Sequence, residues 1–286
     1  MISADIAPQG PINPAADAYA VTCVARSARI PRIPDIAFGP RPAQRLDVYL
    51  PQPGDSPPGG APVFLFWHGG GYTHGHKEWC GFMAPPLQAA GAVFISANYR
   101  LFDEASNAQI HDDARAALGW ALANIRDFGG DPARVVIGGH SAGANIAARV
   151  ALDAPARRAA GIADDAIRAV LAMSGSYLQR RGDTHPDPAL RPVPDEPDAV
   201  SDFAGPCTAS FTTAFTLAWG TQERDPFPQA GAGFARILRE RGYSATEMPF
   251  EGDDHFSVHL ATGQADNAFV RAAMRELGLA EPPAIV

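Results

Sequence analysis

The chain has 286 residues, of which 46% are hydrophobic and 19% are charged, a balance typical of a globular protein with a sizeable core. This length favours one large α/β domain over two small ones, and the composition argues against disorder of the whole chain. The formal net charge of −8 argues against nucleic acid as a partner and, more weakly, against anionic membrane surfaces.

The first part of the chain predicts an N-terminal arm followed by an opening pair of strands. Residues 1–34 are rich in Ala and Pro, and we expect them to form an arm or a short helical lead-in before a single domain at 35–286. Residues 35–39 and 45–50 alternate as β-strands do, and 52–61 is dense in Pro and Gly, which predicts a surface loop.

In the rest of the chain, short apolar runs alternate with segments of helical spacing. The predicted strands are 62–67, 92–98, 135–138, 169–174, 215–219 and 244–250. The predicted helices are 82–90, 108–128, 142–152, 228–241 and 267–277. This alternation predicts a mainly parallel central sheet with helices on both faces. Residues 178–206 break the pattern with many prolines and charges, and we expect them to form a long loop near the active site.

A G-x-S-x-G motif stands at residues 139–143, as Gly-His-Ser-Ala-Gly. It follows a predicted strand and precedes a predicted helix, which is the context that a nucleophile elbow requires. The helix start beyond the serine would aim backbone N–H groups at developing negative charge. The motif therefore predicts Ser141 as a nucleophile, with His140 in the variable position.

A second motif, His-Gly-Gly-Gly at residues 68–71, follows the predicted strand that ends at Trp67. Successive glycines let the bare backbone approach a substrate carbonyl and present N–H donors to it. We expect the amides of Gly70, Gly71 and Ala142 to form an oxyanion hole, while His68 holds the loop in place. The alternative interpretation is a flexible glycine loop without a catalytic role.

A serine hydroxyl needs a base to accept its proton, and in this type of fold the chain order is Ser, then Asp or Glu, then His. His255 follows the last predicted strand and is the expected base, with His259 as the alternative. The acid should follow the strand at 215–219, where spacing does not decide between Glu223 and Asp225. We favour Glu223 and keep Asp225 in reserve.

No metal ion or organic cofactor is expected. His74 and His76 stand beside Glu78 at a spacing that suggests a metal, but a solvated loop is the favoured interpretation. The three cysteines are Cys23, Cys80 and Cys207. Their odd number and the lack of C-x-x-C spacing predict reduced thiols rather than disulfides or a zinc site. With neither a signal-peptide pattern at the N-terminus nor about 18 consecutive apolar residues anywhere, we expect a cytoplasmic protein without a membrane partner.

These motifs resemble those of the α/β-hydrolase esterases that carry HGGG before G-x-S-x-G, as in hormone-sensitive-lipase-like carboxylesterases and in the arylformamidase (kynurenine formamidase-like) branch. The similarity runs from Asp35 to the C-terminus. Further matching segments are Phe38–Gly39, Gln44–Val48, Tyr99–Leu101, Gly129–Pro132 and Asp254–Phe256. Gly220 to Glu223 matches the family's spacing between the glycine that ends the strand and the acid. The short N-terminal arm and Trp79 favour the formamidase-like branch over the enzymes with a large N-terminal cap.

The resemblance implies an α/β-hydrolase fold with a small cap. It also implies a serine hydrolase that cleaves an ester or amide bond of a small molecule through an acyl-enzyme, favoured as arylformamidase-like. The alternative is a carboxylesterase acting on short-chain esters, and a remoter one is a non-catalytic member of the fold that binds a ligand. The expected pocket walls are Tyr72, Trp79, His140 and Phe256. By analogy with the fold, a homodimer is left open.

Overall fold

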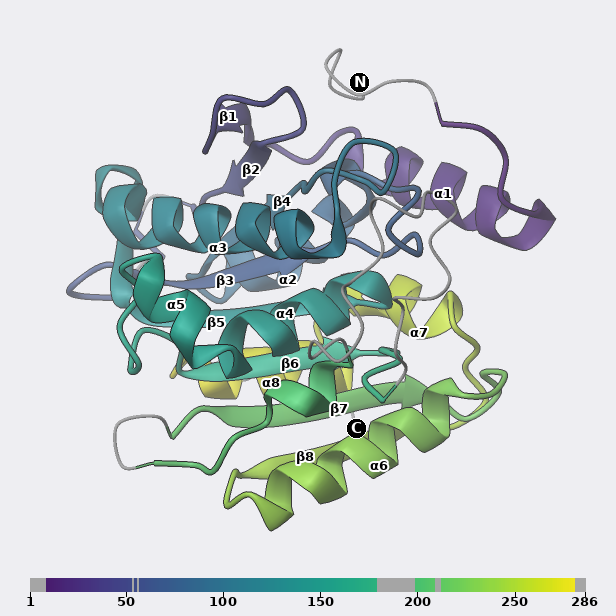
Figure 1. Ribbon diagram of the computed structural model, residues 1–286. Coiled ribbons are helices and arrows are strands. Elements are labelled where there is room, and N and C mark those ends of the chain that lie inside the picture. Colours follow the sequence, from purple (N-terminus) through teal and green to yellow (C-terminus); the bar gives the residue numbers. More distant parts are fainter. Residues whose placement is uncertain (1–8, 53, 56, 179–198, 209–211, 281–286) are drawn as a thin grey trace.

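A computed structural model places eight strands in one sheet with helices on both of its faces (Figure 1). The residues that it describes are 9–52, 54–55, 57–178, 199–208 and 212–280. The strands are β1 (Ile33–Ala37), β2 (Arg45–Tyr49), β3 (Ala61–Trp67), β4 (Val93–Ala97), β5 (Gly130–His140), β6 (Ala169–Met173), β7 (Ala214–Gly220) and β8 (Ala245–Phe250). Their order is β1-β2-β4-β3-β5-β6-β7-β8, and all neighbours from β4 to β8 are parallel. Only the first two pairings, β1 with β2 and β2 with β4, are antiparallel among the described strands.

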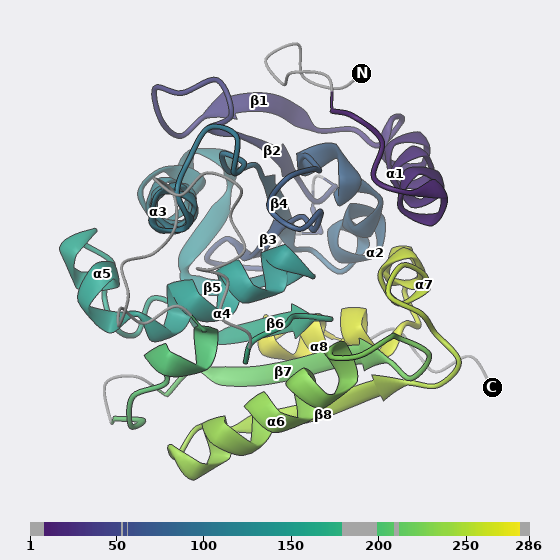
Figure 2. The ribbon, with the colours of Figure 1, turned by 45° about the vertical axis from the view of Figure 1, so that its right-hand side comes forward.

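The helices form two layers, each packed on its own cluster of buried side chains (Figure 2). Helices α3 (Asn107–Asn124), α4 (Ala142–Leu152) and α6 (Phe227–Glu240) cover one face. Helices α1 (Pro14–Ser27), α2 (Ala84–Ala89) and α8 (Ala268–Glu276) cover the other. The shorter helices are α5 (Ala154–Ala159), α7 (Ser257–Leu260) and the 3₁₀ turns η1 (Lys77–Trp79), η2 (Gly81–Met83), η3 (Ile125–Phe128), η6 (Val200–Phe203) and η7 (Ala261–Gly263). The predicted α/β architecture is thereby confirmed.

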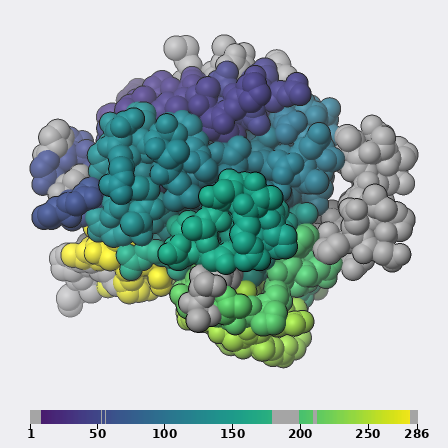
Figure 3. Space-filling view, turned by 60° about the vertical axis from the view of Figure 1, so that its left-hand side comes forward, coloured from purple at the N-terminus to yellow at the C-terminus, as the bar shows by residue number. Residues whose placement is uncertain are grey.

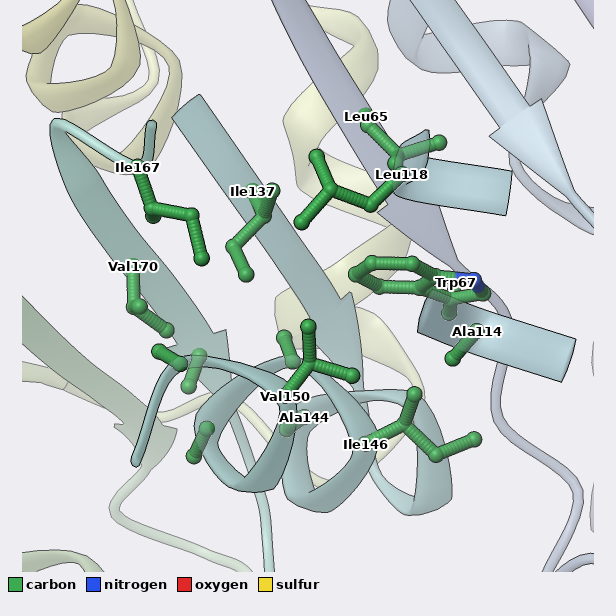
Figure 4. Close-up of a cluster of buried hydrophobic side chains, with 14 of the residues drawn as sticks. Leu65, Trp67, Ala114, Leu118, Ile137, Ala144, Ile146, Val150, Ile167 and Val170 are labelled. Atoms are coloured by element: carbon green, nitrogen blue, oxygen red, sulfur yellow. The ribbon is translucent and has the colours of Figure 1, made fainter. Parts of the chain in front are cut away.

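Strand β3 shows why apolar runs form the centre of the sheet. All seven of its residues are buried, because helices cover both faces. Since successive side chains of a strand point to opposite faces, Leu65 and Trp67 pack toward α3 and α4, while Phe64 and Phe66 pack toward α1 and α8. Figure 4 shows the first of these faces, where Trp67 lies near Ala114 of α3.

Helix α4 lies directly behind the nucleophile motif and is almost entirely buried. Small side chains make up much of the helix, so its backbone can approach the sheet closely. In Figure 4, Val150 points from α4 toward the strands. This close packing fixes the start of α4, and with it the position of Ser141.

The sequence predicted an arm or a short helical lead-in for the N-terminal segment, and in the structure Pro14–Ser27 forms the helix α1. Asn13 caps α1 by accepting a hydrogen bond from the Ala16 amide at 3.1 Å, and Pro14 occupies the first helical position. Tyr19 and Cys23 on the inner side of α1 are buried against the body of the protein. The N-terminal helix is therefore part of the packed structure.

Other boundaries follow the expectations with small shifts. The helix expected at 108–128 appears as α3 followed by η3, and Gly129 ends it in the left-handed region at φ 78°. Most of the expected proline-rich loop, residues 179–198, lies outside the described residues.

Figure 3 shows the side of the molecule covered by α3 and α5. Among the described helices, none has both the length and the apolar character that crossing a membrane requires.

Candidate active site

The candidate site lies where parallel strands end on one edge of the sheet. Ser141 follows β5, Glu223 lies three residues after the end of β7, and His255 lies five residues after the end of β8. The carboxyl ends of parallel strands meet at the same edge, so the sheet brings together residues that are far apart in the sequence. This edge is the usual ligand-binding position in open α/β sheets.

Ser141 occupies a strained turn between β5 and α4. Its backbone angles are φ 54° and ψ −115°, a region that residues other than glycine rarely adopt. Its amide donates to the Met173 carbonyl of the adjacent strand at 2.8 Å, which holds the turn. A Cβ atom at Gly143 would lie 2.0 Å from the Trp67 carbonyl oxygen, and one at Gly139 would lie 2.1 Å from the backbone of Gly143. Both glycines of the motif are therefore required by close backbone contact.

Three side chains form a continuous chain of hydrogen bonds. His255 Nε2 lies 3.0 Å from Ser141 Oγ, and His255 Nδ1 lies 2.7 Å from Glu223 Oε2. The carboxylate accepts a hydrogen bond from the Nδ1–H group, so the Nε2 lone pair faces the serine hydroxyl. The other oxygen of Glu223 accepts from Ser174 Oγ at 2.6 Å and from the Gly220 amide at 2.7 Å. The carboxylate is thus buried but fully hydrogen-bonded.

The two reserve residues lie elsewhere. Asp225 is exposed, and its carboxylate accepts a hydrogen bond from the side chain of Gln229 in α6. His259 is completely buried on α7, with Nδ1 at 2.7 Å from the Tyr19 hydroxyl. The structure therefore brings His255 and Glu223 to Ser141 and leaves Asp225 and His259 outside this chain of hydrogen bonds.

The glycine loop after β3 borders the serine. Gly70 and Gly71 line the same cavity as Ser141, with φ of 112° and 64°, and a Cβ atom at Gly70 would lie 2.0 Å from the His74 carbonyl oxygen. Ala142 begins α4, so its amide belongs to the first turn, where N–H groups have no partner within the helix. The amides of the glycine loop and of the start of α4 are therefore the candidate donors for an oxyanion hole at Ser141.

His68 holds the glycine loop from beneath. Its Nδ1 donates to the Gly69 carbonyl at 2.7 Å, and its ring stacks on Tyr99 with the centroids 4.4 Å apart. The ring is buried, and burial lowers the pKa of His68 to about 3. His68 is therefore neutral at physiological pH and acts as a hydrogen-bond donor to the loop.

A cavity of about 530 Å³ opens above the serine. Its lining residues are Ile12, Asn13, Ala15, Ala16, Tyr19, Gly70, Gly71, Thr73, Trp79, His140, Ser141, Gln222, Glu223, Arg224, Phe227, Asp254, His255 and Phe256. This volume lies in the range of small-molecule sites. Aromatic rings form much of the wall, so the cavity suits an apolar group attached to the reacting carbonyl.

Three of the four expected wall residues line this cavity, and one does not. Trp79, Phe256 and His140 are among the lining residues, although the His140 side chain is 1% exposed. Tyr72 lies instead in the core, where its ring stacks on Phe102 with the centroids 5.2 Å apart. The left-handed backbone of Tyr72, at φ 67°, turns its side chain away from the cavity and toward α3.

The sequence analysis missed the contribution of α1 to the cavity. The first turns of this helix and Tyr19 form one wall, and the Gln9 side chain ties the preceding segment to Gly75 through two hydrogen bonds of 3.0 and 2.8 Å. The Asn-Pro pair at residues 13 and 14 could have signalled the helix start. No local pattern indicates that this helix packs beside Ser141.

A buried charge cluster holds the turn that carries Trp79. Lys77 Nζ lies 2.9 Å from Asp35, 2.8 Å from Asp47 and 2.7 Å from Glu78, and its side chain is 0% exposed. Burial alone would lower the pKa of Lys77, but the attraction of Asp47 and Glu78 outweighs it and raises that pKa. The lysine is therefore charged, and η1 is fastened to the sheet next to the cavity.

Of the two histidines near this turn, His74 is partly exposed, as expected for a solvated loop, whereas His76 is not. His76 is buried, and its Nδ1 donates to Glu78 at 2.9 Å, while His74 Nδ1 lies 2.9 Å from Thr73 Oγ1. Within the described ranges, no group of three or more His, Cys, Asp or Glu side chains is arranged to hold a metal ion. His76 and Glu78 instead belong to the buried charge cluster.

We expect the buried histidines to make the fold less stable as the pH falls from 7 to 5. Burial lowers the pKa of both His68 and His259 to about 3, whereas in the unfolded chain each has a pKa of about 6.5. Between these values the unfolded state binds protons that the folded state does not, so stability rises with pH. Each histidine removes about 2 kcal/mol from the free energy of unfolding between pH 7 and 5.

Urea unfolding at pH 7, 6 and 5 measures this dependence. His259→Phe removes one of the buried imidazoles and keeps an aromatic ring against Phe66, so its unfolding free energy should fall less steeply with pH than that of the wild type. An equal slope for the two proteins would contradict the assignment of a neutral, buried His259.

Comparisons with known proteins agree with this geometry. A family model described as the alpha/beta hydrolase fold matches residues 64–259. This range includes Ser141, Glu223 and His255. The isoprenylcysteine alpha-carbonyl methylesterase ICME of Arabidopsis thaliana is 33% identical over 146 residues, covering 50% of this chain and 34% of that protein. Esterase LipC of Mycobacterium tuberculosis is 35% identical over 120 residues, covering 42% of this chain and 29% of that protein.

The structural similarity extends over nearly the whole chain. EstE1, a thermophilic carboxylesterase from a metagenomic library, superposes with a TM-score of 0.67 at 20% identity and covers 93% of this chain and 96% of its own. An esterase of Pyrobaculum calidifontis gives a TM-score of 0.66 at 21% identity, with 92% of each chain covered. At these identities the likeness concerns the fold. The chain spans between 26% and 58% of the length of the curated relatives that it matches here.

Proposed function

The chain belongs to the α/β-hydrolase fold family, and from this premise we propose that it is a carboxylesterase with Ser141 as the nucleophile. The observation that carries the proposal is the hydrogen-bonded series Ser141, His255 and Glu223 at the floor of a cavity of about 530 Å³. A nucleophile, a base oriented toward it and a group that orients the base are the parts that acyl transfer needs.

In the proposed mechanism, His255 Nε2 takes the proton of Ser141 as Oγ attacks the ester carbonyl. The amides of Gly70, Gly71 and Ala142 stabilise the negative charge that develops on the carbonyl oxygen. As the bond to the leaving group breaks, His255 gives the proton to the departing alkoxide, which leaves as an alcohol, and the acyl group remains on Ser141 Oγ as the acyl-enzyme. Water repeats the same steps and releases the acid. Glu223 keeps the Nδ1 proton in place and stabilises the imidazolium.

The favoured bond is a carboxylic ester, which replaces the arylformamide preferred from the sequence. The relatives and the structural neighbours described above are named as esterases, carboxylesterases and a methylesterase, and they give no support to the formamidase branch. Trp79, one of the reasons for that preference, contributes an aromatic wall that suits an apolar ester equally well. An ester also has the better leaving group, because an amine must be protonated as it departs.

The cavity favours esters with a compact apolar or aromatic group. Tyr19, Trp79, Phe227 and Phe256 surround the space above Ser141, and the rings of Tyr19 and Phe256 stack with their centroids 4.8 Å apart. Such walls bind apolar groups through burial of their surface. The volume accommodates a ring or a short acyl chain together with the leaving group.

A substrate series tests the proposal directly. We expect purified protein to hydrolyse p-nitrophenyl acetate and butyrate with a kcat/KM at least about tenfold above that for formanilide, a difference of about 1.4 kcal/mol in transition-state stabilisation. Faster cleavage of formanilide would instead favour an amidase. Failure to cleave any of these compounds, together with failure of a fluorophosphonate to label Ser141, would indicate a non-catalytic protein that binds a ligand.

A further inference from the structure

A buried set of polar side chains lies beneath His255 and has no part in the mechanism proposed above. It consists of Tyr19 from α1, His140 from the nucleophile motif and His259 from α7. Each side chain is at most 4% exposed as a residue, and the three come from parts of the sequence more than 100 residues apart. Polar groups buried at this depth are normally kept only where they are hydrogen-bonded.

The set contacts the main chain of the proposed base. His140 Nε2 lies 2.8 Å from the carbonyl oxygen of His255, which can only accept a hydrogen bond. His140 must therefore carry its proton on Nε2, and its Nδ1 is left as an acceptor. Burial lowers the pKa of His140 well below its usual range, in keeping with a single proton on this ring.

The Tyr19 hydroxyl is placed to complete this arrangement. Its oxygen lies 3.3 Å from His140 Nδ1 and 2.7 Å from His259 Nδ1. If His259 Nδ1 donates to the hydroxyl and the hydroxyl donates to His140, all three contacts are satisfied at once. If the hydroxyl of Tyr19 donated to His259 instead, it would have no proton left for a hydrogen bond to His140 Nδ1. Burial raises the pKa of Tyr19 well above its usual value, so the hydroxyl keeps its proton.

Packing holds the tyrosine in this position. The ring of Tyr19 stacks on Phe256, the residue after the proposed base, and meets Trp79 edge to face with the centroids 5.5 Å apart. The rings of His140 and His259 stack with their centroids 4.6 Å apart. Cys23, one turn later on α1, and Cys80 also contribute to the raised pKa of Tyr19, and burial raises the pKa of the Cys23 thiol to about 12. It therefore stays a neutral thiol.

We propose that Tyr19 is a positioning residue whose hydroxyl orients His140 so that the His140 N–H holds the main chain of His255 at the height needed to reach Ser141. This inference rests on the proposed function of Ser141 and His255. Glu223 fixes the side chain of the base, and this set fixes its backbone. The N-terminal helix then supplies both a wall of the cavity and a support for catalysis.

Tyr19→Phe tests the inference because it removes the hydroxyl and keeps the ring that lines the cavity. We expect kcat for p-nitrophenyl butyrate to fall about 10- to 100-fold, the size of effect that a small misplacement of a catalytic group produces, with little change in KM. The matched control is Tyr49→Phe, which removes the hydroxyl of another buried tyrosine, on β2, and should leave both constants unchanged. A wild-type kcat in Tyr19→Phe would overturn the positioning role.

A double-mutant cycle with His140→Ala separates positioning from a general loss of packing. If Tyr19 acts through His140, Tyr19→Phe should change kcat by less than about twofold in the His140→Ala background. An equal loss in both backgrounds would contradict the proposal. His140→Gln, whose side-chain amide can still donate to the His255 carbonyl, should retain more activity than His140→Ala.

Nitrogen NMR of histidine in the wild-type protein gives a test that does not depend on the variants folding. His140 should be a neutral ring with its proton on Nε2 from pH 6 to 8. A proton on Nδ1 would reject the positioning role and would leave the proposed function untouched. A wild-type protein that cleaves no ester would reject the proposed function and the positioning role together. If the wild type hydrolyses esters and the Tyr19→Phe variant is equally active, only the positioning role is rejected.

Discussion

Ser141→Ala is expected to lower kcat/KM for the preferred ester by about 10⁴- to 10⁶-fold, the loss seen when the nucleophile of a serine hydrolase is removed. Without Oγ, no acyl-enzyme forms, and His255 Nε2 loses the hydroxyl that lies 3.0 Å away. The residual rate would come from substrate binding and from the amides of Gly70, Gly71 and Ala142, which the substitution leaves in place.

The measurement is steady-state hydrolysis of p-nitrophenyl butyrate, with fluorophosphonate labelling of the same samples. Ser106→Ala is a suitable control, because it removes the hydroxyl that caps α3 at a distance from the cavity and should keep both hydrolysis and labelling. A Ser141→Ala protein that keeps more than about one hundredth of the wild-type rate would point to another nucleophile, given the 10⁴-fold minimum expected.

The elements that could be predicted from the sequence are those whose signals are local. Strand β3 is an uninterrupted apolar run because helices bury both of its faces. The run ends where the chain leaves the sheet. The Ser141 turn is equally readable, because Gly139 and Gly143 are needed by backbone contacts within the turn and with the neighbouring β3 end. Such patterns fix which residues reach the edge of the sheet.

Residues that act through distant contacts gave no such signal. Tyr19 stands in an Ala-rich stretch, yet its hydroxyl meets His140 and His259, which follow 121 and 240 residues later. Lys77 and Glu78 look like ordinary surface charges in a loop, but Lys77 forms ion pairs with Asp47 of β2 and with Glu78 in a buried cluster. In both cases tertiary packing, which no spacing rule records, decides the environment of the side chain.

Tyr72 illustrates the opposite error, in which proximity in sequence was taken for proximity to the substrate. It directly follows the glycine loop, but its left-handed backbone sends the ring into the core beside Phe102. The amide of Phe102 also donates to the Tyr72 carbonyl at 2.9 Å, which fixes the turn on both sides. The direction of a side chain after a run of glycines depends on φ, and glycine-rich sequences leave φ open.

The choice between Glu223 and Asp225 leads to the second large effect. Glu223→Gln should lower kcat by about 10⁴-fold, as removal of the charge does in serine hydrolases whose triad acid is changed to its amide. The carboxylate accepts hydrogen bonds on both oxygens, from His255 on one and from Ser174 and Gly220 on the other. A glutamine must direct its NH₂ group at one of these donors, so either His255 takes the wrong tautomer or the support from Ser174 is lost.

Asp225→Asn is the matched control, since it makes the same chemical change two residues away. Its carboxylate is exposed and bonds only to Gln229 among the contacts of the described chain, so kcat should stay within about threefold of the wild-type value, the range of an ordinary surface substitution. The reverse result, a large loss in Asp225→Asn and a small one in Glu223→Gln, would require the loop after β7 to rearrange when substrate binds. Because Gly220 and Ser174 both hold Glu223 in the free protein, such a rearrangement would have to break two buried hydrogen bonds before catalysis began.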